Sequence, residues 1–342
     1  MTTNRNKRLL WQLPFLTILI IGTVLIIRQQ HATPYQKCAG TIFGTTYHVT
    51  YQYDDDLQQE LEAKMKEVDA SLSMFNKEST ISRVNNNQRT ELTRMFVEVF
   101  QQAQKISEDT NGAFDITVGP LVNAWGFGFK NEQLPDKHAV DSLMAIIGYK
   151  KVSYDGKQIV KSDPRITLDC SAIAKGYGVD AVARLLEEKG VDNYMVEIGG
   201  EVVTRGISEK RVPWKIGVTE PTDDPLLEGN ELQTVLNVTD KAMATSGNYR
   251  NFYYKGGKRY AHTIDPSTGY PVEHSLLSAT VLARDCATAD AYATSFMVMG
   301  IDQAREVLAK HPELMAYFIY SDNEGKNAVW FSDTLRDKIA EE

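Results

Sequence analysis

The chain has 342 residues, with 37 Lys and Arg against 45 Asp and Glu, and it contains three cysteines. A folded region of this size buries roughly three quarters of the surface of its unfolded chain, so it needs no disulfide or metal scaffold. The formal net charge of −8 argues against a protein that binds nucleic acid through clustered Lys and Arg. We therefore expect a globular protein without a nucleic-acid partner.

The amino-terminal segment differs in charge from the rest of the chain. Residues 1–53 hold five basic and no acidic residues, which leaves 32 basic and 45 acidic residues, a net charge of −13, in the remainder. Residues 9–27 form an uncharged apolar run that would be about 28 Å long as a helix, enough to span a bilayer. Its basic flank, residues 1–8, predicts a cytoplasmic tail.

This run is better explained as an uncleaved anchor than as a cleaved signal peptide. The residues that follow it begin with Arg28 and lack the small residues of a cleavage site. A lipoprotein signal does not fit either, because Cys38 lies ten residues beyond Arg28. We expect a single-pass protein of the bacterial inner membrane whose body lies on the periplasmic side.

A polar linker over residues 28–38 and one folded body over residues 39–342 are predicted next. Helical spacing of apolar residues predicts helices over 57–72, 92–106, 173–188 and 288–299. Alternation with β-branched and aromatic residues predicts strands over 45–53, 158–161, 165–169, 193–198, 214–218, 232–238 and 276–284. This mixture predicts an α+β fold with mixed, largely antiparallel sheets and flanking helices.

Standard nucleotide-binding and hydrolase motifs are missing from the sequence, but a pair of oxygen donors stands out. A helix places Asp290 and Thr294 four residues apart on one face. A carboxylate and a hydroxyl suit a hard cation such as Mg²⁺, which substrate phosphates usually help to bind. On these residues alone, a capped helix start with Thr288 as the cap explains the pattern at least as well.

A second candidate site lies at the start of the helix predicted near Ser171. Free N–H groups at a helix start attract anions, and Lys175 adds a positive charge beside Gly176. This arrangement suits a phosphate group. The alternative is an ordinary capped helix with a Lys that faces solvent.

A third candidate is His262, three residues before Asp265. A carboxylate at that distance can orient an imidazole that accepts a proton. The alternative is a histidine that only forms structural hydrogen bonds.

Four glycine-rich segments with nearby aromatic residues complete the candidates: 112–120, which includes Asp115, 125–128, 197–200 and 245–249, which includes Ser246 and Gly247. Glycines let the backbone approach a flat or phosphorylated ligand, and aromatic rings can cover a ring system. The same residues also occur at bends and in cores.

The order and the residues of these segments together resemble those of the ApbE family of FAD:protein FMN transferases. The resemblance runs through FGTTYHV (43–49), SMFNKESTISRVN (73–85), GAFDITVGPLVNAWGFG (112–128), LDCSAIAKGYGVD (168–180), EIGGEV (197–202), ATSGNYRNF (244–252), RYAHTIDPSTGYPV (259–272) and DCATADAYATSFMVMG (285–300). It implies an ApbE-like, T-fold-related domain. It also implies a Mg²⁺-dependent enzyme that cleaves FAD, releases AMP and attaches FMN to a Thr or Ser hydroxyl of a target protein.

The resemblance also assigns roles to residues. Metal ligation would fall to Ala172, Asp290 and Thr294, and proton transfer to His262, with Asp265 and Lys175 assisting. Contacts with FAD would come from Phe43, Ser73, Met74, Phe75, Asp115 and Lys175, to which the glycine-rich segments add Ser246 and Gly247. The expected targets are exported or membrane subunits of respiratory complexes. FAD hydrolysis by water and a non-catalytic flavin carrier remain the alternatives.

Overall fold

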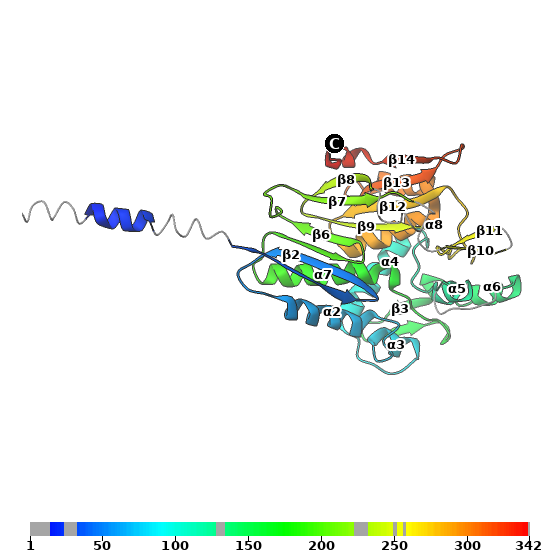
Figure 1. Cartoon of the computed structure of the whole chain (residues 1–342). Coiled ribbons are helices and arrows are strands. Elements are labelled where there is room, and N and C mark those ends of the chain that lie inside the picture. The colour runs from blue at the N-terminus through cyan, green and yellow to red at the C-terminus, as the bar shows by residue number, and fades with distance from the viewer. Residues whose placement is uncertain are drawn as a thin grey trace, which may run out of the picture.

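A central antiparallel sheet of eight strands organises the protein (Figure 1). The computed structural model describes residues 14–23, 33–127, 134–221, 232–248, 252–255 and 258–340. In spatial order the strands are β1 (Tyr35–Ile42), β2 (Thr45–Gln52), β5 (Tyr194–Ile198), β6 (Glu201–Arg205), β9 (Lys241–Gly247), β12 (Leu276–Ala283), β13 (Met315–Ser321) and β14 (Asn327–Phe331). Every neighbouring pair in this sheet is antiparallel, which confirms the predicted fold class.

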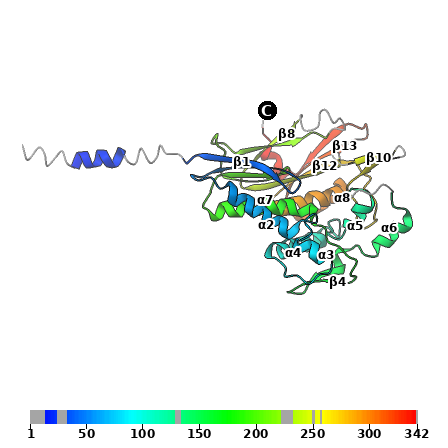
Figure 2. The ribbon, with the colours of Figure 1, turned by 60° about the horizontal axis from the view of Figure 1, so that its bottom comes forward.

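Helices cover one face of the sheet in two layers (Figure 2). Two long helices, α7 (Ser171–Glu188) and α8 (Cys286–Lys310), lie against the strands. The outer helices are α2 (Gln58–Leu72), α3 (Thr80–Asn85), α4 (Arg94–Asp109), α5 (Gly119–Ala124) and α6 (Lys137–Met144). Small buried residues, including Ala287, Ala289, Ala291 and Ala293, let α8 approach its neighbours closely. The cores between these layers hold the two central helices in fixed positions.

The opposite face of the sheet is covered in part by a separate hairpin. Strands β7 (Trp214–Thr219) and β8 (Leu232–Val238) pair with each other, and Val218 and Leu236 pack on Met243 and Leu282 of the sheet. The 3-10 helix η2 (Asp333–Lys338) completes this cluster. The remaining elements are η1 (Tyr149–Lys151), β3 (Val152–Tyr154), β4 (Ile159–Lys161), β10 (Phe252–Lys255) and β11 (Lys258–Ala261). Both faces of the sheet therefore carry packed elements near β9.

The helices predicted over 57–72, 92–106 and 173–188 are confirmed with small changes at their ends. The helix predicted over 288–299 is the first part of α8, which continues to Lys310 beyond a non-helical Gly300. The strand predicted over 165–169 is wrong. In that segment, the backbone of Leu168 forms hydrogen bonds with a side chain and not with a neighbouring strand. The amide of Asn85 donates to the carbonyl oxygen of Leu168 at 2.8 Å and accepts from its N–H at 2.7 Å. Asn85 thus satisfies both backbone groups of Leu168, and the N–H of Asp169 donates to the carbonyl oxygen of Ile116 at 2.6 Å.

The predicted amino-terminal boundaries need one correction. Strand β1 begins at Tyr35, so the linker predicted over 28–38 overlaps the folded body, which starts earlier than residue 39. Residues 14–23 are helical, and the rest of the predicted anchor, 9–13 and 24–27, lies outside the described residues. Among the described residues, no helix combines the length and the apolar character that crossing a membrane requires.

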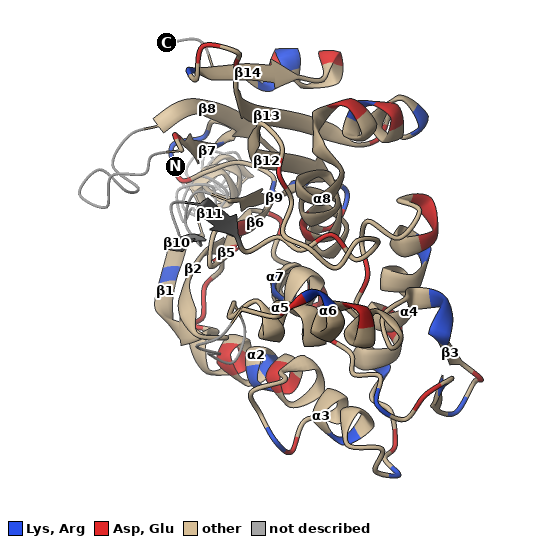
Figure 3. Ribbon diagram, turned by 90° about the vertical axis from the view of Figure 1, so that its right-hand side faces the viewer, with Lys and Arg blue, Asp and Glu red and all other residues tan. Residues whose placement is uncertain are grey.

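Charges of both signs are interspersed along the outer helices (Figure 3). Helix α2 carries Glu60, Glu62, Lys64 and Lys66 within seven residues. The acidic excess of the chain is therefore not gathered on these helices, and any site for an anion must obtain its positive charge locally.

Candidate functional site

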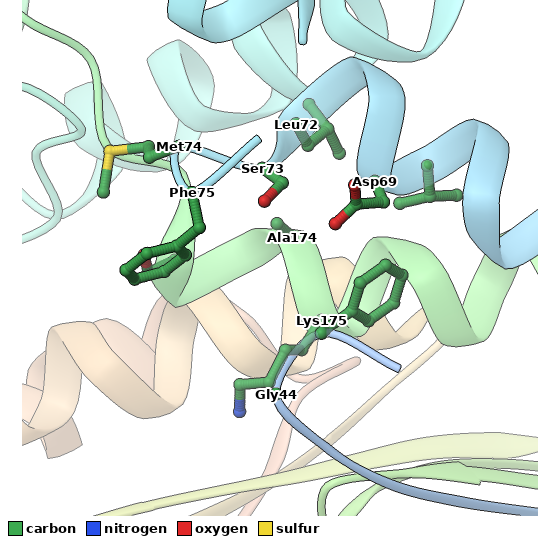
Figure 4. A pocket seen from close by; sticks show the side chains of 11 residues that line it. Gly44, Asp69, Leu72, Ser73, Met74, Phe75, Ala174 and Lys175 are labelled. Atoms are coloured by element: carbon green, nitrogen blue, oxygen red, sulfur yellow. The ribbon is translucent and has the colours of Figure 1, made fainter. Parts of the chain in front are cut away.

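Two cavities meet at the start of α7, where both are lined by Ser171 and Lys175. The first, here called the apolar cavity, has a volume of about 520 Å³ and is also lined by Phe43, Gly44, Val68, Asp69, Leu72, Ser73, Met74, Phe75 and Ala174 (Figure 4). The second, here called the polar cavity, has a volume of about 440 Å³. Its lining includes Asp115, Asp169, Ala172, Gly199, Glu201, Thr245, Ser246, Gly247, His262, Asp290 and Thr294. Every residue predicted for the site except Asp265 lines one of the two.

The apolar cavity owes its shape to a tight turn. Phe43 and Gly44 connect β1 to β2 with φ angles of 52° and 75°, the left-handed conformation that a two-residue hairpin turn requires at both positions. The Phe43 ring lies against α7 at Gly178, where a Cβ atom would come within 2.7 Å of the ring. Across the cavity the side chain of Phe75 is 72% exposed. Two aromatic side chains therefore flank a space suited to a flat ring.

The polar cavity contains a group of oxygen donors from α8 and β9. Asp290 and Thr294 share one face of α8, as the spacing predicted. An Asp290 carboxylate oxygen accepts a hydrogen bond from the N–H of Gly176 at 3.1 Å. The Thr294 hydroxyl lies 3.1 Å from the hydroxyl of Ser246. These contacts fix both donors against α7 and the sheet.

Lys175 lies between two carboxylates in the polar cavity. Its amino group pairs with Glu201, which is 3% exposed, and the charge of Asp290 also acts on it. Burial would lower the pKa of Lys175, but the two carboxylates outweigh this effect and raise it. Burial and the neighbouring Asp290 raise the pKa of Glu201 to about 7, and burial also raises the pKa of Asp290. One lysine does not balance two carboxylates, so the cluster favours an added cation.

Glu201 is a site residue that the sequence analysis missed. Its second carboxylate oxygen, Oε2, is buried and has no hydrogen-bond partner among the residues that the structure describes. Isolated buried oxygens of this kind are rare in proteins. A signal was available in the sequence, because Glu201 directly follows the Gly199-Gly200 turn, but only the fold brings it beside Lys175.

The first turn of α8 is fixed to α7 by a buried carboxylate. Asp180 accepts hydrogen bonds from the N–H groups of Cys286 at 2.7 Å and Ala287 at 2.9 Å. Burial, with the nearby Asp285, raises the pKa of Asp180 to about 7. Gly176 lies at the same contact, so the register of the two helices sets the distance from Lys175 to Asp290.

The remaining predicted residues occupy different positions around the polar cavity. His262 lines it, and its ring centroid lies 6.3 Å from that of Phe127. The Asp265 carboxylate accepts hydrogen bonds from Ser267 and Thr268 and organises the turn that follows. The orienting role of Asp265 toward His262 stays a prediction.

Asp115 supports the backbone around the cavity. One carboxylate oxygen accepts hydrogen bonds from the N–H and the hydroxyl of Thr117, and the other accepts from the N–H of Tyr149 at 2.7 Å. Burial nonetheless raises the pKa of Asp115. Its predicted contact with FAD stays a prediction.

Comparison with known proteins agrees with this geometry. Residues 43–318, which include every residue that lines the two cavities, match the ApbE family. The chain belongs to the ApbE family. It is 38% identical to the FAD:protein FMN transferase of Haemophilus influenzae over 311 residues, covering 86% of this chain and 89% of the relative. It is 32% identical to the Escherichia coli K12 protein of the same name, covering 91% of each chain.

Solved structures of ApbE proteins share the fold. The flavin transferase ApbE from Vibrio cholerae superposes with a TM-score of 0.81 at 34% identity, covering 89% of this chain and all of that one. The apo form of the flavinyl transferase ApbE from Pseudomonas stutzeri gives a TM-score of 0.80 at 30% identity, covering 89% of this chain and 96% of that one. The predicted family and its α+β architecture are confirmed.

The donor set of this ApbE protein fits a magnesium ion. Mg²⁺ takes hard oxygen ligands, and the polar cavity offers the carboxylate of Asp290, the hydroxyl of Thr294 and the backbone of Ala172. The excess negative charge of the cluster and the unpartnered Oε2 of Glu201 both favour a cation there. Among the described residues, no group of three or more His, Cys, Asp or Glu side chains forms a metal site. A site here would depend on phosphate oxygens of the substrate.

Proposed function

We propose that this ApbE protein transfers FMN from FAD to a Thr or Ser hydroxyl of a target protein, with Mg²⁺ as its cofactor, and releases AMP. The observation that carries the proposal is that the apolar and polar cavities share Ser171 and Lys175. A ligand with a flat ring at one end and charged phosphates in the middle can lie across this junction. The names of the relatives from Haemophilus influenzae and Escherichia coli support the same reaction.

The reaction exchanges the phosphoanhydride bond between the two phosphates of FAD for a phosphoester bond to the acceptor. The acceptor oxygen forms a bond to the phosphorus of the FMN half, and the bond from that phosphorus to the bridging oxygen breaks. AMP leaves with the bridging oxygen, and the acceptor proton passes to His262. Lys175 supplies positive charge at the phosphates, where transfer depends mainly on charge neutralisation and positioning. Mg²⁺, held by Asp290, Thr294 and Ala172, would supply further neutralisation.

The amino-terminal run suggests where the reaction takes place. Residues 9–27 are apolar and uncharged, and Arg5, Lys7 and Arg8 precede them. We propose that this segment anchors the protein in the inner membrane with its catalytic body in the periplasm. The acceptor would then be an exported or membrane subunit of a respiratory complex, such as one that carries FMN in the sodium-pumping NADH:quinone reductase.

Mass spectrometry of the acceptor tests the proposal. The purified full chain is incubated with FAD, Mg²⁺ and that subunit. We expect the acceptor mass to rise by one FMN residue at a Thr or Ser, with one AMP released for each transfer. AMP and free FMN without a change in acceptor mass would favour the hydrolase instead.

Single substitutions distinguish a catalytic transferase from a non-catalytic flavin carrier. His262→Ala should lower the transfer rate by about 10²- to 10⁴-fold without weakening FAD binding, because only the proton acceptor is lost. His138→Ala is the matched control, since His138 lies exposed on α6 and lines neither cavity. Transfer at the normal rate by His262→Ala would remove the role assigned to His262. Flavin-dependent function that survives Asp290→Ala would favour a carrier.

A further inference from the structure

A third cavity lies beside the polar cavity. It has a volume of about 240 Å³ and shares Gly199, Thr245 and Gly247 with the polar cavity. Its other walls come from β6 and from Ile216, Gly217 and Thr219 of β7. We call this space the β7 groove.

The β7 groove lies on the sheet face opposite the helices. On β9, Ser246 faces α8, where it meets Thr294, and Met243 packs in the cluster under β7 and β8. Because successive strand residues face opposite sides, Thr245 and Gly247 point the same way as Met243. The groove and the polar cavity therefore meet around the ends of the strands, at Gly199 and Gly247.

Strand β7 lines this groove and, among the described residues, has one unpaired edge. Within the described part of the chain, β7 pairs with β8 alone. The groove is lined by both Ile216 and Gly217, and because glycine has no side chain, the strand's backbone itself lines the groove at Gly217. Unpaired N–H and C=O groups at such an edge can bind another extended chain.

The opposite wall of the groove is a rigid glycine turn. Gly199 and Gly200 adopt φ angles of 63° and 97° between β5 and β6. Glu197 fixes the turn, because it accepts a hydrogen bond from the N–H of Gly200 at 2.6 Å and pairs with His48 at 2.7 Å. No atom of the described structure lies within 4 Å of a Cβ built on Gly200. The turn leaves room for a backbone to pass over it.

We propose that the β7 groove binds the acceptor segment of the target protein as an extended strand on the edge of β7. The segment passes over the Gly199-Gly200 turn and places its Thr or Ser hydroxyl in the polar cavity, near His262. Four of the ten residues that line the groove are glycines, and its volume is small. The residues that flank the acceptor hydroxyl therefore carry small side chains.

This inference rests on the proposed function, because FAD fills the other two cavities and the protein acceptor must approach from elsewhere. A transferase needs a route by which a second macromolecule reaches the bound nucleotide. The β7 groove shares three residues with the polar cavity and none with the apolar cavity. It therefore provides such a route without displacing the flavin ring.

A substitution that fills the groove tests the inference. Thr219→Trp places a large side chain in the groove from β7, and of the residues assigned to FAD, the metal or proton transfer only Gly247 lines the same groove. We expect kcat/KM for the respiratory subunit to fall about tenfold or more, while the Kd for FAD is unchanged. Lys215→Trp is the matched control, because Lys215 is exposed on the same strand and lines none of the three cavities. Unchanged kcat/KM in Thr219→Trp, with FAD bound normally, would overturn the inference.

Amide hydrogen exchange of the unmodified full chain gives a second measurement that needs no variant. Addition of the same subunit should slow exchange within 214–219, and unchanged exchange there would also overturn the inference. If the unmodified enzyme transfers no FMN to the subunit, the proposed function itself fails. If instead the enzyme transfers FMN normally but β7 shows no slower exchange, only the role of the β7 groove is refuted.

Discussion

The contact between α7 and α8 should be highly sensitive to a single methyl group at Gly176. A Cβ atom at this position would lie 2.4 Å from the carbonyl oxygen of Cys286 and 2.8 Å from the N–H nitrogen of Ala287. Carbon and oxygen atoms normally approach to about 3.3 Å, so Gly176→Ala must move the helices apart by about 1 Å. Both contacting atoms are backbone, so no side chain can rotate away to relieve the clash.

The expected effects follow from this displacement. Overpacking costs about 1 to 3 kcal/mol, and the better helix propensity of alanine offsets about 1 kcal/mol of it. We expect Gly176→Ala to lower the free energy of unfolding by up to about 2 kcal/mol in urea titrations. Asp290 moves with the first turn of α8, and misplacement of a catalytic group by about 1 Å can cost about 10²-fold in rate. The FMN transfer rate should fall by about that factor.

Gly178→Ala, two residues along the same helix, is the comparison. Its Cβ atom would meet the ring of Phe43 at 2.7 Å, and a side chain can yield where a backbone cannot. This variant should keep wild-type stability within about 1 kcal/mol but bind FAD more weakly, because Phe43 lines the apolar cavity. If Gly176→Ala kept both wild-type stability and the wild-type transfer rate, the assigned role of the α7–α8 contact would be refuted.

Three further substitutions test other parts of the site. Asn85→Ala leaves the N–H and carbonyl of Leu168 unpaired and should lower the free energy of unfolding by about 2 to 4 kcal/mol in denaturant titrations; an unchanged midpoint would contradict this. Because the pKa of Asp180 is raised, the folded state binds more protons than the unfolded state between about pH 4 and pH 7. The free energy of unfolding therefore falls as pH rises through this window, by at most about 4 kcal/mol. Asp180→Asn should remove that part of the slope in urea titrations between pH 4 and pH 7, and a wild-type slope would argue against it. Phe43→Asn suits the left-handed turn before Gly44, so it should raise the Kd for FAD, measured by flavin fluorescence, more than it lowers stability; unchanged FAD affinity would contradict the role of Phe43.

Local patterns predicted the long elements and much of the site. The spacing of apolar residues located α2, α4, α7 and α8, because the periodicity of a helix can be read from one continuous segment of the sequence. The same periodicity placed Asp290 and Thr294 on one face of α8. The strands were predicted less completely, because β1, β3, β6, β9, β10, β11, β13 and β14 were not expected from the sequence. Among these, β6 and β13 are buried on both faces, and such strands lose the alternation that marks half-buried ones.

The segment 165–169 shows why local pattern can mislead. Its β-branched and apolar residues suit a strand, yet the backbone partner is the side chain of Asn85, more than 80 residues earlier. No property of the segment itself could reveal that partner. The missed site residue Glu201 has the same cause, since its partners Lys175 and Asp290 lie on two different helices.

The sequence by itself determined the family, the α+β class and twelve of the residues that line the two cavities, because these depend on short motifs and local periodicity. Only the tertiary structure decided how those residues are combined. In the folded chain, Lys175 lies between Glu201 and Asp290, and Asp265 forms the hydrogen bonds of a turn. Strand β7, with one edge unpaired among the described residues, lies beside the polar cavity. These arrangements depend on the packing of segments far apart in the chain, and such distances are not encoded in any one segment.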